Sequence, residues 1–256
     1  MINSKQIQQK IRQADSLEIL IGINVLLFLF SQIFSAFGWF SLRYVALPYE
    51  IQSSAQLFRL LTYGFFHSGF VALFINMLLL FYLGSILLDF VSGRKLWQLY
   101  LSGVIIGGVF FAGAYKFFPD MYVIKSPLLG ASAGVMAVMT YTAMLMPHYQ
   151  IKIRFLGYFK LVHILLFFIF FNLLQIPLGN PGGYFAHLGG LTVGFILFLS
   201  DKFFFEKKTP KSKDIFKIPK TKRQRKIDAI LDKINRSGYE SLTQDEKEEL
   251  FRQSNK

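Results

Sequence analysis

The sequence predicts an all-α polytopic membrane protein with six transmembrane helices and a short cytoplasmic helical hairpin. Hydrophobic residues make up 53% of its 256 residues, and 30 of them are Phe. Soluble domains of this length rarely carry so many large apolar side chains. Six apolar runs approach the roughly 20 residues that a helix needs to cross a hydrocarbon core of about 30 Å. Because the runs are continuous and not alternating, they favour helices over strands.

The predicted helices are separated by segments that contain Gly, Pro and other turn-forming residues. Their ranges are Ile19–Phe40, Phe70–Phe90, Leu96–Tyr115, Leu128–Met146, Phe159–Ile176 and Tyr184–Ser200. Ser41–Arg59, between the first two, is longer and semi-polar, and we expect it to lie in the membrane interface. No small-residue cleavage site follows the charged N-terminal residues, so we interpret the first run as a retained helix.

These boundaries divide the chain into four parts. Residues 1–18 form a cytoplasmic N-terminal segment, 19–200 the six-helix membrane domain, 201–224 a basic juxtamembrane linker and 225–256 the helical hairpin. Thr243 followed by Glu246 is a capping-box pattern, which predicts a helix from Gln244 to about Gln253. A docking or regulatory role and a merely solubilising role are equally compatible with this tail.

The charge distribution predicts orientation in the cell membrane. The net charge is +13, and eleven of the 28 Lys and Arg lie between Lys202 and Lys226, just after the last apolar run. A basic segment in this position favours contact with anionic lipid head groups over nucleic-acid binding. Most of the other Lys and Arg fall on the same side of the predicted helices. The positive-inside rule therefore places both termini in the cytoplasm.

Three polar residues lie inside the apolar runs, where placing a polar side chain in lipid costs free energy. Asn76, Ser132 and His187 fall on the second, fourth and sixth predicted helices. Each alone is explained by helix packing or by a bond to the preceding turn. All three, however, lie near the start of a helix that runs inward from outside, roughly 6–10 Å below the boundary. This shared depth indicates a site that opens to the outer side.

The fourth segment supports the same site. A helix from Ser132 to the residue before Pro147 is about 22 Å long, too short to span the core. The preceding stretch, Ser126–Ala131, is then irregular backbone, which is tolerated at membrane depth only inside protein or beside water. We therefore expect Ser132 to face a water-accessible cavity.

Small residues surround two of these positions. Gly130 and Gly134 flank Ser132, and Gly190 and Gly194 repeat the same spacing after His187. Such small-xxx-small faces allow two helix backbones to approach closely. We predict that these four glycines pack the fourth helix against the sixth and bring Ser132 to His187.

The residue types suggest acyl-transfer chemistry. Ser132 Oγ would attack a carbonyl, His187 would transfer the proton, and Asn76 with the Ser132 backbone N–H would donate to the oxyanion. No Asp or Glu lies at this depth, so the sequence predicts a Ser–His dyad in which another group must orient the imidazole. His163 and Asn172 are interpreted as helix-packing residues. Two interpretations of His67 stay open: it lines the mouth of the outer cavity, or it is a plain interfacial histidine, which we favour.

Three segments carry a family resemblance: His67 to Met77, Gly130 to Gly134, and Ala186 to Gly194. They resemble, in order, the signature segments of the rhomboid intramembrane proteases, and the likeness covers roughly Leu17 to Ser200. The resemblance implies a serine endopeptidase that cuts transmembrane protein substrates near the outer face, with no cofactor or metal. Several positions depart from the family pattern. Ala72 replaces a histidine of the oxyanion site, and Met136 replaces a tyrosine that packs on the catalytic histidine. Ala133 follows the serine where Gly is common, and Leu42-Arg43 stands where a Trp-Arg pair is common.

Two other functions predict different features of the sequence. A catalytically inactive rhomboid relative that binds membrane clients is favoured by Ala72 and Met136, whereas retention of Ser132 and His187 favours activity. A transporter or channel would place polar residues at mid-membrane on several helices and show related halves. Neither feature is found in the sequence.

Overall fold

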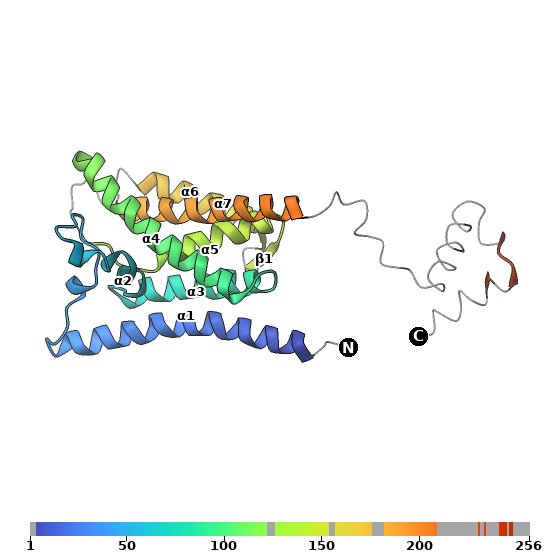
Figure 1. The fold of residues 1–256 in the computed structure, drawn as a ribbon, viewed down its shortest axis with the longest axis horizontal. Coiled ribbons are helices and arrows are strands. Elements are labelled where there is room, and N and C mark those ends of the chain that lie inside the picture. Colours follow the sequence, from blue (N-terminus) through green and yellow to red (C-terminus); the bar gives the residue numbers. More distant parts are fainter. Residues whose placement is uncertain are drawn as a thin grey trace. The chain divides into compact units, whose positions relative to one another are not determined.

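The structure, a computed structural model, describes residues 4–121, 126–153, 157–175 and 182–208, together with residues 230, 233, 241–244, 246 and 247. The long helices lie side by side (Figure 1). The helices are α1 Ser4–Ala36, α2 Arg59–Thr62, α3 Phe70–Leu88, α4 Gly93–Phe117, α5 Ser132–Leu145, α6 Leu161–Gln175 and α7 Gly182–Lys208. Short 3-10 turns occur at Leu42–Tyr44, Ser54–Gln56, Tyr63–Phe65 and Pro119–Met121, and a hairpin comprises β1 Gln150–Ile153 and β2 Gly157–Lys160.

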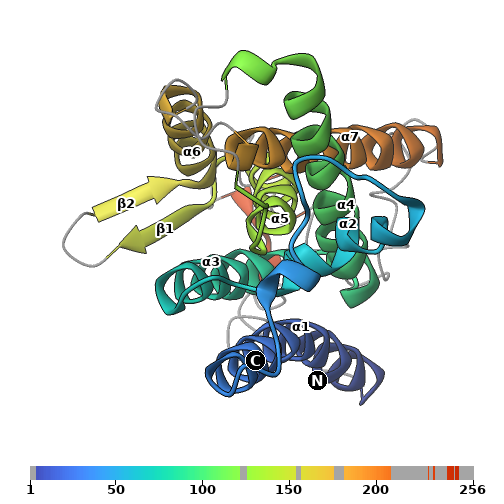
Figure 2. The same ribbon diagram turned by 90° about the vertical axis from the view of Figure 1, so that its left-hand side faces the viewer.

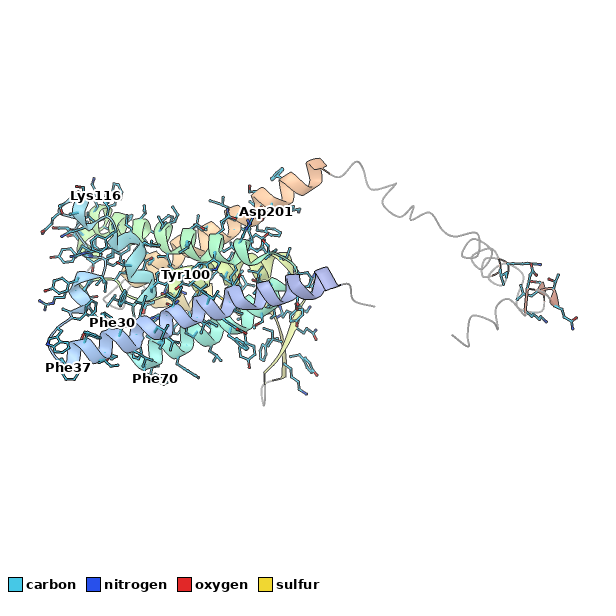
Figure 3. All side chains as sticks on the ribbon, turned by 60° about the horizontal axis from the view of Figure 1, so that its bottom comes forward. Phe30, Phe37, Phe70, Tyr100, Lys116 and Asp201 are labelled. Carbon is cyan, nitrogen blue, oxygen red and sulfur yellow. The ribbon has the colours of Figure 1, made fainter. Side chains whose placement is uncertain are left out.

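Among the described residues, four helices are long and apolar enough to cross a membrane: Ser16–Ala36, Phe70–Leu88, Gly93–Phe117 and Gly182–Phe203. Two shorter apolar helices, Ser132–Leu145 and Leu161–Leu174, join them. Large apolar side chains cover the outside of the bundle, and Phe30, Phe37 and Phe70 lie on that surface (Figure 3). The chain is therefore a helical membrane protein.

Helix α5 occupies the centre of the bundle, with α3, α4, α6 and α7 around it (Figure 2). Every residue from Ala133 to Ala143 is buried. With 14 residues, α5 is about 21 Å long, shorter than a hydrocarbon core. A helix that begins at Ser132 and ends before Pro147 was the shorter possibility within the predicted run Leu128–Met146, and it is confirmed. The apolar run therefore starts four residues before the helix.

The predicted end of the first helix was wrong. α1 ends at Ala36, four residues before Phe40. Gly38 adopts φ 74°, and the N–H of Trp39 donates to the carbonyl of Phe34 at 2.9 Å, which is the hydrogen bonding of a Schellman C-cap. The apolar run continues past the cap because exposed Phe37 and Trp39 extend it, so hydropathy alone overestimates the helix.

The hairpin was also not predicted. β1 and β2 pair antiparallel, with Gln150 opposite Lys160 and Ile153 opposite Gly157. Gly157 has φ 95°, a conformation that favours glycine. α6 consequently begins at Leu161 and not at Phe159.

Tyrosines fix the segment before α3 to the bundle. The Tyr63 hydroxyl donates to the Val104 carbonyl at 2.6 Å, and the Tyr100 hydroxyl donates to the Gly64 carbonyl at 2.7 Å. Both side chains are almost completely buried, and Figure 3 shows Tyr100 inside the bundle. The turn Tyr63–Phe65, which follows the predicted interfacial segment Ser41–Arg59, is therefore packed onto α4.

The C-terminal unit, residues 203–256, is described at a few positions only. The Thr243 N–H donates to Glu246 Oε2 at 2.8 Å, and Lys233 Nζ lies 2.8 Å from the same oxygen. These contacts hold the pKa of Glu246 below its usual value. The Thr243 N–H to Glu246 bond is one of the two bonds of the predicted capping box. Most of the predicted hairpin lies outside the described residues.

Candidate active site

Ser132 is the first residue of α5, and the chain reaches it through irregular backbone. Leu128 and Leu47 exchange two backbone hydrogen bonds, at 2.8 and 3.1 Å. The N–H of Gly130 donates to the Tyr63 carbonyl at 2.9 Å. Protein groups therefore satisfy much of this backbone.

His67 packs against the same loop. Its side chain is fully buried, and its Nε2 accepts a hydrogen bond from the Ala131 N–H at 3.4 Å. Nδ1 has no hydrogen-bond partner among the described residues. Burial lowers the pKa of His67 to about 4, so the imidazole is neutral and able to accept at Nε2. The burial of His67 against the loop that leads to Ser132 was not predicted from the sequence.

Helix α7 brings His187 close to α5 because glycines remove side chains from the contact. A Cβ added at Gly190 would collide with the Ala133 carbonyl, and one added at Gly194 would lie 2.5 Å from the Ala137 carbonyl oxygen. Ala133 and Ala137 of α5 thus face α7, and there the two backbones meet directly.

The other two glycines have different roles from those expected. A Cβ at Gly134 would lie 2.8 Å from the Tyr100 ring, so this glycine packs α5 against α4. At Gly130 nothing lies within 4 Å, but φ is 121°. Glycine is needed at Gly130 for the backbone conformation and not for helix packing.

The close approach places Ser132 and His187 within hydrogen-bonding distance. Nε2 of His187 lies 2.7 Å from Ser132 Oγ, a distance that permits proton transfer from the hydroxyl. The Tyr184 ring lies edge-on to the imidazole, with centroids 6.0 Å apart. An aromatic contact on the histidine therefore exists although Met136 occupies the family's tyrosine position.

Asn172 on α6 contacts the other nitrogen of the same imidazole. Its Oδ1 lies 2.5 Å from His187 Nδ1, and its Nδ2 donates to the Phe168 carbonyl at 2.7 Å. Asn172 is 2% exposed. The sequence interpretation of Asn172 as a helix-packing residue missed this contact. One signal could have found it: a histidine that receives a serine proton needs a partner for its second nitrogen.

Asn76 lies on α3, where its Nδ2 donates to the carbonyl of Ala72 at 2.9 Å. This bond to the preceding turn uses one of the two amide hydrogens. The structure therefore brings Ser132 and His187 together, and it gives Asn76 a partner within its own helix.

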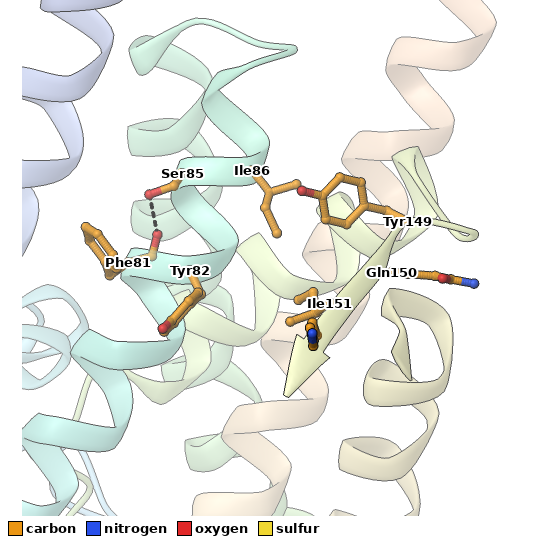
Figure 4. A pocket seen from close by; sticks show the side chains of 8 residues that line it. Phe81, Tyr82, Ser85, Ile86, Tyr149, Gln150 and Ile151 are labelled. Carbon is orange, nitrogen blue, oxygen red and sulfur yellow. Dashed lines mark hydrogen bonds between the residues drawn. The ribbon is translucent and has the colours of Figure 1, made fainter. Parts of the chain in front are cut away.

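A separate pocket lies elsewhere in the bundle. It has a volume of about 390 Å³ and is lined by Phe81, Tyr82, Ser85, Ile86 and Tyr149–Lys152 (Figure 4). These residues belong to the later part of α3 and to the segment after α5. Ser132 begins α5, so this pocket is not part of the candidate active site.

The fold and the Ser–His pair define a class of protein. It is a helical membrane protein in which a serine at the start of one helix is hydrogen-bonded to a histidine of another helix. Residues 54–201 match the Rhomboid domain family, and because this match covers more than half of the chain, the protein belongs to the rhomboid family. Residues 213–256 match a second family, of unknown function (DUF6576). A comparison with curated proteins found no match.

Proposed function

We propose that the protein is an intramembrane serine endopeptidase that cleaves membrane-anchored proteins near the outer face. The observation that carries the proposal is the 2.7 Å contact between Ser132 Oγ and His187 Nε2. An isolated membrane serine bonds to its own preceding turn, whereas this one faces a histidine from another helix. Membership of the rhomboid family, whose members are generally intramembrane proteases, supports the same chemistry.

The proposed reaction has two steps, acylation of Ser132 and hydrolysis of the resulting ester. Ser132 Oγ attacks the scissile carbonyl carbon while its proton passes to His187 Nε2. The tetrahedral intermediate then loses the amine, which takes that proton, and Ser132 is left as an ester. Water attacks the ester, again giving a proton to Nε2, and the carboxylic acid product leaves as Ser132 regains the proton.

The oxyanion would be stabilised by backbone and amide donors. The Ser132 N–H lies at the free N-terminus of α5, where helix amides have no carbonyl partner within the helix. Asn76 would contribute its second amide hydrogen, or would release Ala72 when a substrate carbonyl arrives. With Ala72 in place of a histidine, a donor is missing, which would cost on the order of a hundredfold in rate.

The membrane arrangement is part of the proposal. The six apolar helices would each cross or enter the cell membrane with both termini in the cytoplasm, since the basic residues gather on that side. The basic segment after α7 would contact anionic lipids. Substrates would be proteins with a transmembrane helix, and no nucleic acid would be bound.

A second candidate function is an inactive rhomboid that binds membrane clients. The observation in its favour is that the Asn76 amide donates to the Ala72 carbonyl within α3. Ala72 also occupies the position at which the family usually carries the oxyanion histidine. The two functions differ in turnover, so one assay separates them.

The test compares wild type and Ser132→Ala, purified in detergent, on a broad panel of single-span substrates. We expect cleavage by wild type and none by the variant. Cleavage that persists in Ser132→Ala would remove Ser132 as the nucleophile. Binding of substrates by both proteins without cleavage would establish the inactive client binder.

A further inference from the structure

We propose that Asn172 is the third member of a Ser–His–Asn relay: it positions His187 and holds the imidazole in the tautomer that can accept the serine proton. The proposal rests on the proposed protease function and extends it, because the sequence predicts a dyad without an orienting group. Asn172 comes from α6, Ser132 from α5 and His187 from α7, so three helices meet at the site.

The Phe168 carbonyl determines which way the Asn172 amide points. A carbonyl oxygen can only accept, so the group that faces Phe168 at 2.7 Å must be the NH2 of Asn172. The amide oxygen then faces His187 Nδ1 at 2.5 Å. Because an amide oxygen can only accept, Nδ1 must carry the proton.

A neutral imidazole carries one proton. With that proton on Nδ1, Nε2 has a free lone pair and accepts from Ser132 Oγ at 2.7 Å. This is the tautomer that general-base catalysis requires. The chain of contacts from Phe168 through Asn172 and His187 to Ser132 thus points every donor in one direction.

A neutral partner suits this position in the membrane. Asn172 is almost fully buried, and a carboxylate there would be costly in a low-dielectric environment. The amide fixes the tautomer and the ring orientation without a buried charge. It would stabilise the imidazolium of the transition state less than a carboxylate does, so its contribution is chiefly positional.

Variants at Asn172 test the proposal by kinetics. Asn172→Leu keeps the size but removes the acceptor, and we expect kcat to fall about a hundredfold with KM unchanged, the order that mispositioning costs. Asn172→Asp keeps an oxygen facing His187, and its second oxygen, when protonated, can donate to Phe168. We expect this variant to remain within about tenfold of wild type. His163→Leu removes an exposed polar side chain from the same helix and serves as the control with full activity.

A loss of kcat in Asn172→Leu that Asn172→Asp does not restore would overturn the positional role. So would equal loss in His163→Leu. If Asn172→Leu does not fold, as judged by gel filtration in detergent, Asn172→Ala takes its place in the same comparison.

The tautomer itself can be observed by 15N NMR of protein labelled at its four histidines. The His187 signals are those that disappear in His187→Gln. We expect a protonated Nδ1 and an unprotonated Nε2 in wild type, and averaged tautomers in Asn172→Leu. A proton on Nε2 in wild type, or unchanged signals in Asn172→Leu, would overturn the proposal. This readout needs no turnover, so it separates failure of the relay from failure of the protease function.

Discussion

Gly130 links backbone conformation to the position of the nucleophile, two residues before Ser132. At φ 121° a residue with a side chain is strained whatever space surrounds it, by about 1–3 kcal/mol. We predict that Gly130→Ala lowers the thermal denaturation midpoint in detergent and reduces cleavage. Gly113→Ala, also in open space but at a helical position in the last turns of α4, should lower neither, because Ala favours a helix over Gly. Equal effects of the two substitutions would show that the Gly130 conformation has no role.

His67 predicts a pH dependence of stability. The pKa of His67 is about 4 in the folded protein because of burial, against about 6.5 when the chain is unfolded. Between these values the unfolded state binds the additional proton, so stability is full above pH 6.5 and declines as the pH falls towards 4, by about 3 kcal/mol at most. Thermal denaturation in detergent should show this decline in wild type and a weaker one in His67→Gln. Identical profiles would contradict the burial of a neutral His67 beneath the Ser132 loop.

At the scale of elements, the α5–α7 contact determines whether a Ser–His pair can form. Gly190→Ala adds a methyl group that collides with the Ala133 carbonyl, and because this neighbour is backbone, the helices must separate. We predict loss of cleavage and a lower denaturation midpoint. Gly183→Ala on the same helix meets nothing within 4 Å and should retain activity. Full activity of Gly190→Ala would contradict the close contact.

The sequence could predict α5 better than its neighbours for a physical reason. A short apolar run between Pro127 and Pro147 has little freedom in where a helix begins and ends. The end of α1 was missed because interfacial aromatics resemble membrane residues in hydropathy. Asn172 was missed because its partner lies on another helix, and spacing along one helix does not reveal which face turns towards a histidine elsewhere. The burial of His67 was missed because its partner, the Ala131 N–H, is 64 residues away in the sequence.

For the whole molecule, the proposed orientation can be measured directly because the chain contains no Cys. Exposed Lys116, at the end of α4, and Lys152, on the hairpin after α5, lie on opposite sides in the proposed topology. In intact cells a membrane-impermeant maleimide should label Lys116→Cys, and Lys152→Cys only after permeabilisation. The reverse pattern would invert the topology and place the site on the cytoplasmic side.

The central claim is that His187 activates Ser132 within the membrane protein. It is tested most directly by exposing purified protein to a fluorophosphonate and locating the adduct by peptide mass spectrometry. The account predicts phosphonylation at Ser132 in wild type and its loss in His187→Ala. An unmodified Ser132 in folded wild-type protein, or equal modification in His187→Ala, would contradict it.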